Sequence, residues 1–258
     1  MRNMLSVAGR ELRAYFHSPI AYLVMALFAL LCGYFFYNYT ALFVVQTFRM
    51  MAMGQMAGQN ISINEYIIRP LFQGLLAVVL LFLIPLITMR LFAEEKRSGT
   101  IELLLTSPLT DLEIILGKFL GSLAFYVVLM LLAFLYVGLL FIYGNPAAKP
   151  LLALALGMLL YGSALLSLGM CISTFTKNQI IAGAVALTVF LILYGFDWVN
   201  AYSSSTVGRV MSYMALTTHF ENFAKGVIDS ADVVYYLSVI GIGIFLTARS
   251  VEALKGRA

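Results

Sequence analysis

Residues Ala93 to Lys118 read AEEKRSGTIELLLTSPLTDLEIILGK, a charged segment that separates two long apolar runs. Charged side chains are costly inside a bilayer, so this segment is expected to face water between two membrane spans. It nevertheless carries four large apolar side chains: Ile101, Leu103, Leu104 and Leu105. Apolar residues held at an aqueous surface are typical of a docking site. The segment therefore predicts a membrane protein that binds a partner at its surface.

The composition agrees with a membrane protein. Of the 258 residues, 62% are hydrophobic and 11% are charged, which excludes an ordinary soluble domain. The net charge of +4 does not require nucleic acid, because membrane proteins carry excess Lys and Arg in cytoplasmic loops. Cys32 and Cys171 both lie in apolar runs and are interpreted as small buried residues rather than a disulfide or a metal pair.

Six segments approach the roughly 20 apolar residues that a transmembrane helix needs. They are residues 20–44, 70–92, 119–143, 151–175, 180–199 and 233–248. The predicted fold class is an all-α polytopic membrane protein with six transmembrane helices. It forms a single transmembrane domain over residues 1–258.

The distribution of basic residues predicts the orientation. With both termini on one side, that side holds eleven of the sixteen Lys and Arg residues: Arg2, Arg10, Arg13, Arg90, Lys96, Arg97, Lys118, Lys177, Arg249, Lys255 and Arg257. The other side holds Arg49, Arg69, Lys149, Arg209 and Lys225. The positive-inside rule then places both termini and residues 93–118 in the cytoplasm.

Residues 1–18 are predicted to form an amphipathic helix at the membrane surface. One face carries Met4, Leu5, Ala8, Leu12, Tyr15 and Phe16, and the opposite face carries Arg2, Arg10 and Arg13. The alternative is a basic tail that only sets the topology. Pro19 ends this helix before the first span.

Two breaks give residues 93–118 a defined shape. Gly99 interrupts the helix that leaves the second span, Thr100 caps a short apolar helix, and Pro108 prevents its continuation. Thr110 and Glu113 then fit a capping box that starts the next helix. The pattern predicts a rigid knob with a polar rim from Glu94, Glu95 and Glu102. The alternative, that the leucines lie in the lipid headgroup layer, is about equally compatible with the composition.

The loop over residues 200–232 is predicted to contain a short interfacial helix. Thr218 and Glu221 fit a capping box, and Phe220, Phe223 and Val227 follow at helical spacing. His219 is interpreted as a residue at the helix start rather than a ligand, because no second His, Cys or carboxylate pair converges on it in sequence.

The chain resembles the permease subunit of type-2 ABC transporters, closest to the gliding-motility (Gld-type) and nitrous-oxide-reductase maturation (Nos-type) branch. The resemblance rests on Phe92–Arg97, Gly99–Leu104, Ser107-Pro108 and Leu116–Lys118, and it extends over essentially the whole chain. A second stretch, His219–Asp229, also resembles this branch of the family.

The resemblance implies a permease subunit of an ATP-driven transporter in the bacterial inner membrane. Two six-span subunits, identical or paralogous, would pair above two copies of a cytoplasmic ABC ATPase. The docking residues carried over are Glu94, Glu95, Thr100, Ile101, Glu102, Leu103, Leu104, Leu105, Ser107 and Pro108. The chain has no Walker A pattern, so ATP and Mg would be bound by the partner ATPase and this subunit would hold no cofactor.

The residue types in the spans indicate what kind of substrate the protein would transport. Ionisable residues are nearly absent from the spans, which argues against an ion-coupled carrier and favours a lipid-like or hydrophobic substrate. The sequence shows no cluster of catalytic or metal-binding residues, so an integral membrane enzyme is disfavoured. A mechanotransmission subunit that moves no solute and acts on an accessory protein at the membrane or in the periplasm remains the alternative.

Small residues are expected to pack helices closely. Gly117 and Gly121 open the third span as a G-x-x-x-G pattern, and the fourth span carries Gly157, Gly162 and Gly169. Packing within one subunit is favoured over a dimer face.

Overall fold

The computed structural model describes residues 2–53, 62–100, 109–202 and 206–255, and no strand occurs among them. Six helical stretches in this part of the chain are long and apolar enough to cross a membrane: Pro19–Ala52, Asn64–Ser98, Asp111–Tyr143, Ala148–Ser173, Gln179–Asp197 and Ser230–Lys255. The predicted all-α, six-helix membrane class is confirmed. Each stretch extends beyond the predicted span at one or both ends, because apolar composition marks the hydrocarbon and not the helix end.

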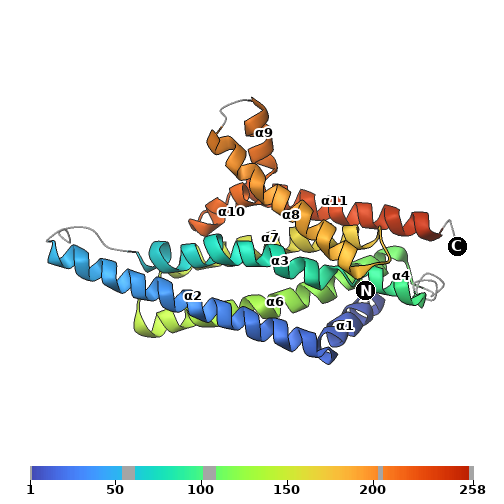
Figure 1. Ribbon diagram of the computed structural model, residues 1–258, viewed down its shortest axis with the longest axis horizontal. Coiled ribbons are helices and arrows are strands. Elements are labelled where there is room, and N and C mark those ends of the chain that lie inside the picture. Colours follow the sequence, from blue (N-terminus) through green and yellow to red (C-terminus); the bar gives the residue numbers. More distant parts are fainter. Residues whose placement is uncertain (1, 54–61, 101–108, 203–205, 256–258) are drawn as a thin grey trace.

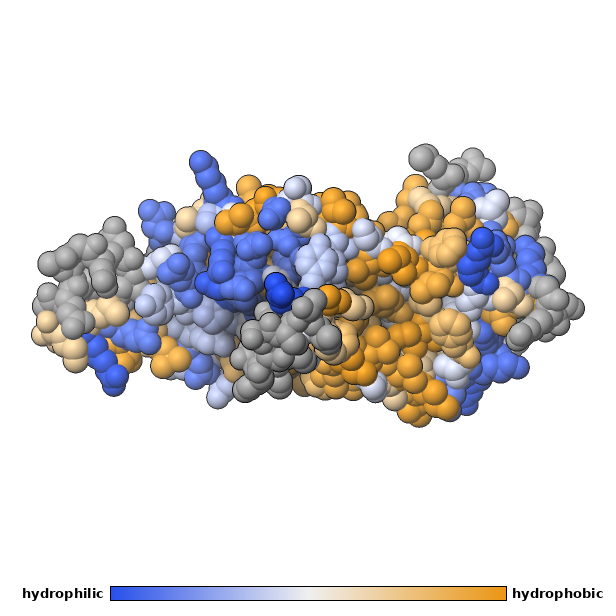
Figure 2. All heavy atoms as spheres, turned by 90° about the horizontal axis from the view of Figure 1, so that it is seen from above, coloured by the Kyte–Doolittle hydropathy of each residue, from blue (hydrophilic) through white to orange (hydrophobic). Residues whose placement is uncertain are grey.

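The bundle is elongated, and its two ends differ (Figure 1). Helix α1 (Arg2–His17), helix α4 (Ala93–Ser98) and the C-terminal end of helix α11 (Ser230–Lys255) lie at the same end. Figure 2 shows a hydrophobic band across the molecule with hydrophilic surface on both sides of it along the long axis. This is the surface of a multi-pass membrane protein.

Helix α1 is a helix, as predicted, but one face packs on α6 (Asp111–Tyr143). Val7 and Tyr15 are buried, whereas Leu5, which was placed on the apolar face, is 62% exposed. Gly117 and Gly121 of α6 make this approach possible, since a Cβ at Gly117 would lie 2.6 Å from the Val7 Cβ. The G-x-x-x-G pattern therefore packs α6 against α1 within one chain.

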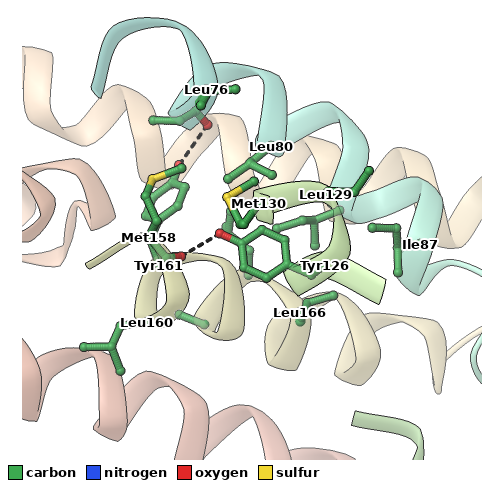
Figure 3. Packing of buried hydrophobic residues seen from close by; sticks show 14 of the residues in the cluster. Leu76, Leu80, Ile87, Tyr126, Leu129, Met130, Met158, Leu160, Tyr161 and Leu166 are labelled. Carbon is green, nitrogen blue, oxygen red and sulfur yellow. Dashed lines mark hydrogen bonds between the residues drawn. The ribbon is translucent and has the colours of Figure 1, made fainter. Parts of the chain in front are cut away.

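Helix α7 (Ala148–Ser173) is the central helix and contacts α3 (Ala77–Thr88), α6, α8 (Gln179–Tyr202), α10 (Leu216–Ala224) and α11. Two buried tyrosines join it to its neighbours (Figure 3). The Tyr126 hydroxyl donates to the Met158 carbonyl at 2.6 Å, and the Tyr161 hydroxyl donates to the Ala77 carbonyl at 3.2 Å. Each hydroxyl thus finds an acceptor where no water is available.

The second membrane-crossing stretch begins earlier than the predicted residue 70. Wide π-helical turns, η1 (Asn64–Ile68) and η2 (Pro70–Leu76), precede α3. In them the Arg69 amide donates to the Asn64 carbonyl five residues back. Because Pro70 lacks an amide proton and its ring crowds the preceding turn, an ordinary α-helix would be disrupted here. The wider π-helical turns allow the helix to continue through Pro70.

The predicted capping box at Thr218 is wrong. Helix α10 begins at Leu216, two residues before Thr218, with Ala215 in the capping position. The Thr218 hydroxyl donates to Asp197 Oδ1 at 3.0 Å, an acceptor that lies 21 residues away. The Ser212 carbonyl lies at the same distance from this hydroxyl, so the Thr218 side chain faces acceptors outside α10 instead of capping it. Helices α9 (Thr206–Met214) and α10 are short and lie beside the start of α11 (Figure 1).

Candidate functional site

The helix that carries the docking segment is broken just before it. Helix α3 contains Pro85 and ends at Thr88, and α4 starts at Ala93. The four residues between them, 89–92, form a turn that we call the α3–α4 joint. Carbonyl groups at a helix end have no partner within the helix, so they need partners from elsewhere.

Helix α1 supplies the first partner. The Tyr15 hydroxyl donates to the Ile87 carbonyl at 2.9 Å, and the Tyr15 ring lies under the Arg90 guanidinium at 3.9 Å. Burial raises the pKa of Tyr15 well above its ordinary value, so the hydroxyl stays a donor. The contact fixes the end of α3 to α1.

Helices α6 and α7 hold the rest of the joint. The Lys118 ammonium donates to the Leu91 carbonyl at 2.8 Å, and the Phe92 amide donates to Ser173 Oγ at 2.9 Å. One turn later, Lys96 donates to the carbonyl of Thr174, which caps α7. Three different helices therefore fix the direction in which α4 leaves the bundle.

Lys118 also forms the centre of a buried ion cluster. Its side chain is 1% exposed, and its Nζ lies 2.9 Å from Glu11 Oε1 and 2.8 Å from Glu95 Oε1. Glu95 Oε2 is buried without a hydrogen-bond partner, and Arg10 lies 3.7 Å from Glu95 Oε1. The cluster joins α1, α4 and α6 by charge. A buried cation of this kind is stable only while its carboxylates remain in place.

The structure places three of the ten predicted docking residues. Glu94 and Thr100 are exposed beside the segment, and Thr100 Oγ1 lies 2.8 Å from Ser98 Oγ. Glu95 instead turns inward to Lys118, so its carboxylate binds within the chain. The others lie outside the described residues: Ile101, Glu102, Leu103, Leu104, Leu105, Ser107 and Pro108.

Both ends of the predicted knob have the expected local structure. Gly99 has φ of +73°, a left-handed conformation that ends α4 and that glycine adopts without strain. At the other end Thr110 accepts from the Glu113 amide at 3.3 Å, and Glu113 Oε2 accepts from the Thr110 amide at 3.2 Å. The predicted break and the predicted capping box are confirmed. The two helices on either side of residues 101–108 therefore have defined ends.

A cavity of about 600 Å³ separates α1 from α4. Its lining is strongly charged and includes Arg10, Glu11, Arg90, Glu94 and Lys118. The cavity opens beside Thr100, where the docking segment begins. Water can therefore reach the base of the segment while Lys118 itself stays shielded.

Sequence reasoning missed the residues that hold the joint. Tyr15 was assigned to a lipid-facing side and Ser173 was not singled out. Lys118 was used as a topological charge and as part of the Leu116–Lys118 resemblance, and no ion-pair partner was predicted for it. One signal was available for Lys118: it stands within the apolar run of α6, one residue after the Gly117 contact with α1. A lysine so close to a packing glycine needs a carboxylate partner nearby.

Comparison with known proteins identifies the family. Residues 5–225, most of the chain, match the family described as ABC-2 family transporter protein. The chain belongs to the ABC-2 transporter family. Its match ends before α11, the last membrane-crossing helix.

Two curated relatives are similar to this ABC-2 family chain. Each is described as the probable multidrug ABC transporter permease YbhS, one from Escherichia coli strain K12 and one from Escherichia coli O157:H7. Both are 30% identical over 199 residues, which cover 74% of this chain and 49% of the relative. The chain thus spans about half the length of the curated relatives it matches.

Removing the Tyr15 hydroxyl tests the joint. In Tyr15→Phe the Ile87 carbonyl loses its partner in a buried place, at an expected cost of about 1–3 kcal/mol. Thermal unfolding in detergent should show a lower Tm. Tyr22→Phe is the matched control, because Tyr22 is 55% exposed. Equal Tm values for the two variants would mean that the Tyr15 hydrogen bond does not stabilise the joint.

Proposed function

We propose that the chain is the transmembrane permease subunit of an ATP-driven ABC transporter, driven by a separate cytoplasmic ATPase that docks on residues 93–118. One observation carries the proposal: in a chain of the ABC-2 family, the helix leading into the apolar docking segment is fixed by α1, α6 and α7. A segment attached so firmly moves together with the bundle. A push on the segment is then passed to the spans as a rigid-body displacement.

The orientation follows from the same end of the bundle. Both chain ends lie at the end that carries α4 (Figure 1), and most basic residues lie on that side of the predicted topology. We therefore assign that end to the cytoplasm, in a bacterial inner membrane. Two permease subunits and two ATPase subunits would form the complete complex, as the resemblance to the Gld-type and Nos-type branch implies.

For the transported compound we propose a hydrophobic or amphipathic class. The buried hydroxyls of the described spans already donate to carbonyls: those of Tyr126, Tyr161 and Tyr236 to other helices, and those of Thr88, Ser122, Ser163, Ser167 and Thr247 to their own helix. The described spans thus give an ion or a sugar little to bind in the core. The relatives described as probable multidrug permeases suit this class. The Gld-type resemblance keeps mechanotransmission to an external accessory protein as the second candidate.

Docking is tested by Leu104→Asp. A carboxylate on the apolar knob should not enter an apolar groove of the ATPase, so association is expected to fall at least about tenfold, equivalent to about 1.4 kcal/mol. The measurement is co-purification from native membranes. The partner is identified by its Walker A sequence and by ATP hydrolysis.

The control is Leu112→Asp. Leu112 is also apolar and is 57% exposed, but it lies in the first turn of α6 and is not one of the ten predicted docking residues. Unchanged association and ATPase activity in Leu104→Asp would refute docking at this segment. ATP-dependent uptake or release of a hydrophobic dye in proteoliposomes then separates transport from mechanotransmission.

A further inference from the structure

A buried histidine and a buried carboxylate meet where α9, α10 and α11 join, far from α4. His219 of α10 and Asp232 of α11 are 4% and 5% exposed. His219 Nδ1 lies 2.7 Å from Asp232 Oδ1, and His219 Nε2 lies 2.9 Å from the Tyr213 carbonyl oxygen. Sequence spacing did not indicate this contact, because Asp232 is brought in from the next helix.

The hydrogen bonds fix how many protons the pair holds. A neutral imidazole has one donor nitrogen and one acceptor nitrogen. The Tyr213 carbonyl can only accept, so Nε2 must carry a proton. The short contact between Nδ1 and Asp232 also needs a proton, since a nitrogen lone pair and a carboxylate would repel each other. The pair therefore keeps one proton more than a neutral histidine beside an ionised aspartate.

That extra proton belongs on the histidine. An aspartic acid is ordinarily a stronger acid than an imidazolium. The Asn222 amide also donates to Asp232 Oδ2 at 2.8 Å, so both carboxylate oxygens have partners. The pair is thus an imidazolium and a carboxylate that satisfy each other in a nearly closed site.

We propose that His219 and Asp232 form a proton-dependent latch that holds α9 and α10 on the start of α11. With the proton in place, His219 binds α9 through the Tyr213 carbonyl and α11 through Asp232. Without the proton, one ring nitrogen of His219 points its lone pair at an oxygen, either of Asp232 or of the Tyr213 carbonyl. The negative charge of Asp232 is then buried without a cation beside it. Both contacts cannot then be kept, and the three helices separate more easily.

Aromatic rings from two helices surround His219. On α11 the Tyr235 ring stacks on His219 at 3.8 Å, and the Tyr236 ring lies 6.5 Å away. On α9 the Tyr213 ring meets His219 edge-on at 4.8 Å. Phenols stay neutral near pH 7.

The nearby carboxylates have partners of their own. Glu221 of α10 pairs with Lys225 at 2.7 Å and with Arg69 of the π-helical segment at 3.4 Å. Asp197 of α8 accepts from Thr218 at 3.0 Å. The face of α7 against α10 contributes the Tyr161 ring, which contacts Phe220.

The direction of the pH effect follows. A histidine exposed by separation of the helices loses its proton near pH 6.5, whereas the latched form requires that proton. The latch is therefore fully present at lower pH and is lost as the pH rises. The latch acts on α9, α10 and α11 and does not depend on ATPase docking. The latch proposal and the docking proposal can therefore fail independently.

The proton is observed directly by nuclear magnetic resonance of ¹⁵N-histidine-labelled protein. The chain has two histidines, and His17→Gln leaves His219 as the only signal. We expect attached protons on both ring nitrogens of His219 near pH 7. A single attached proton on His219 at that pH would overturn the proposal.

Movement is measured with spin labels at Val210→Cys of α9 and Leu237→Cys of α11, which are exposed positions, with Cys32 and Cys171 replaced by Ala. The label separation should broaden as the pH rises. His219→Gln should lose this response. Asp232→Asn should lose it as well, because a side-chain amide can donate to an unprotonated Nδ1. His17→Gln is the control and should keep it. An unchanged response in His219→Gln, or none in the parent, would contradict the latch.

Discussion

Lys118→Met should destabilise the protein more than any other single charge removal among the described residues. The substitution keeps the length of the side chain but leaves Glu11 and Glu95 without the cation between them. It also leaves the Leu91 carbonyl without its donor. Removing one partner of a buried ion pair typically costs about 3–5 kcal/mol, and we expect a loss in that range.

The measurement is Tm in detergent together with the amount of folded protein in the membrane. Lys177→Met is the control, because Lys177 is exposed at the same end of the bundle. Adding Glu11→Gln and Glu95→Gln to Lys118→Met should restore part of the stability, since no uncompensated charge then remains buried. If the triple variant is no more stable than Lys118→Met, the loss does not arise from the unpaired carboxylates.

Gly162→Val should have the second largest effect, through overpacking of the core. A Cβ at Gly162 would lie 2.2 Å from Tyr126 Cζ, and Tyr126 is fully buried with its hydroxyl bound to Met158 (Figure 3). The ring cannot move aside without breaking that hydrogen bond. The expected cost is about 1–3 kcal/mol from strain, to which the broken bond adds.

Gly138→Val is the matched control, because a Cβ at Gly138 meets no atom within 4 Å. Both glycines lie inside membrane-crossing helices, so the two substitutions differ mainly in the space available. Thermal unfolding should separate them by several degrees. Gly162→Val combined with Tyr126→Ala should recover stability relative to Gly162→Val alone. Equal Tm values for Gly162→Val and Gly138→Val would show that α6 and α7 can move apart at little cost.

The local features of the docking region were readable from sequence because they depend on near neighbours. Gly99 ends α4 in a left-handed conformation, and Thr110 and Glu113 cap α6 three residues apart. The same reasoning failed at Thr218, where the pattern fitted a capping box. There Asp197 offered the hydroxyl a tertiary acceptor, and the helix began at Leu216 instead. A capping pattern therefore does not by itself fix the residue at which a helix begins.

The sequence by itself determined the class of protein, the six membrane-crossing helices and the breaks around residues 101–108. Long apolar runs in a bilayer must satisfy their backbone groups internally, and that requirement alone selects helices. Only the tertiary structure decided which side chains hold them together. Lys118 meets Glu11 across 107 residues, and Tyr15 meets Ile87 across 72. Partners this far apart leave no periodic pattern in the chain, because helix packing and not sequence spacing brings them within hydrogen-bond distance.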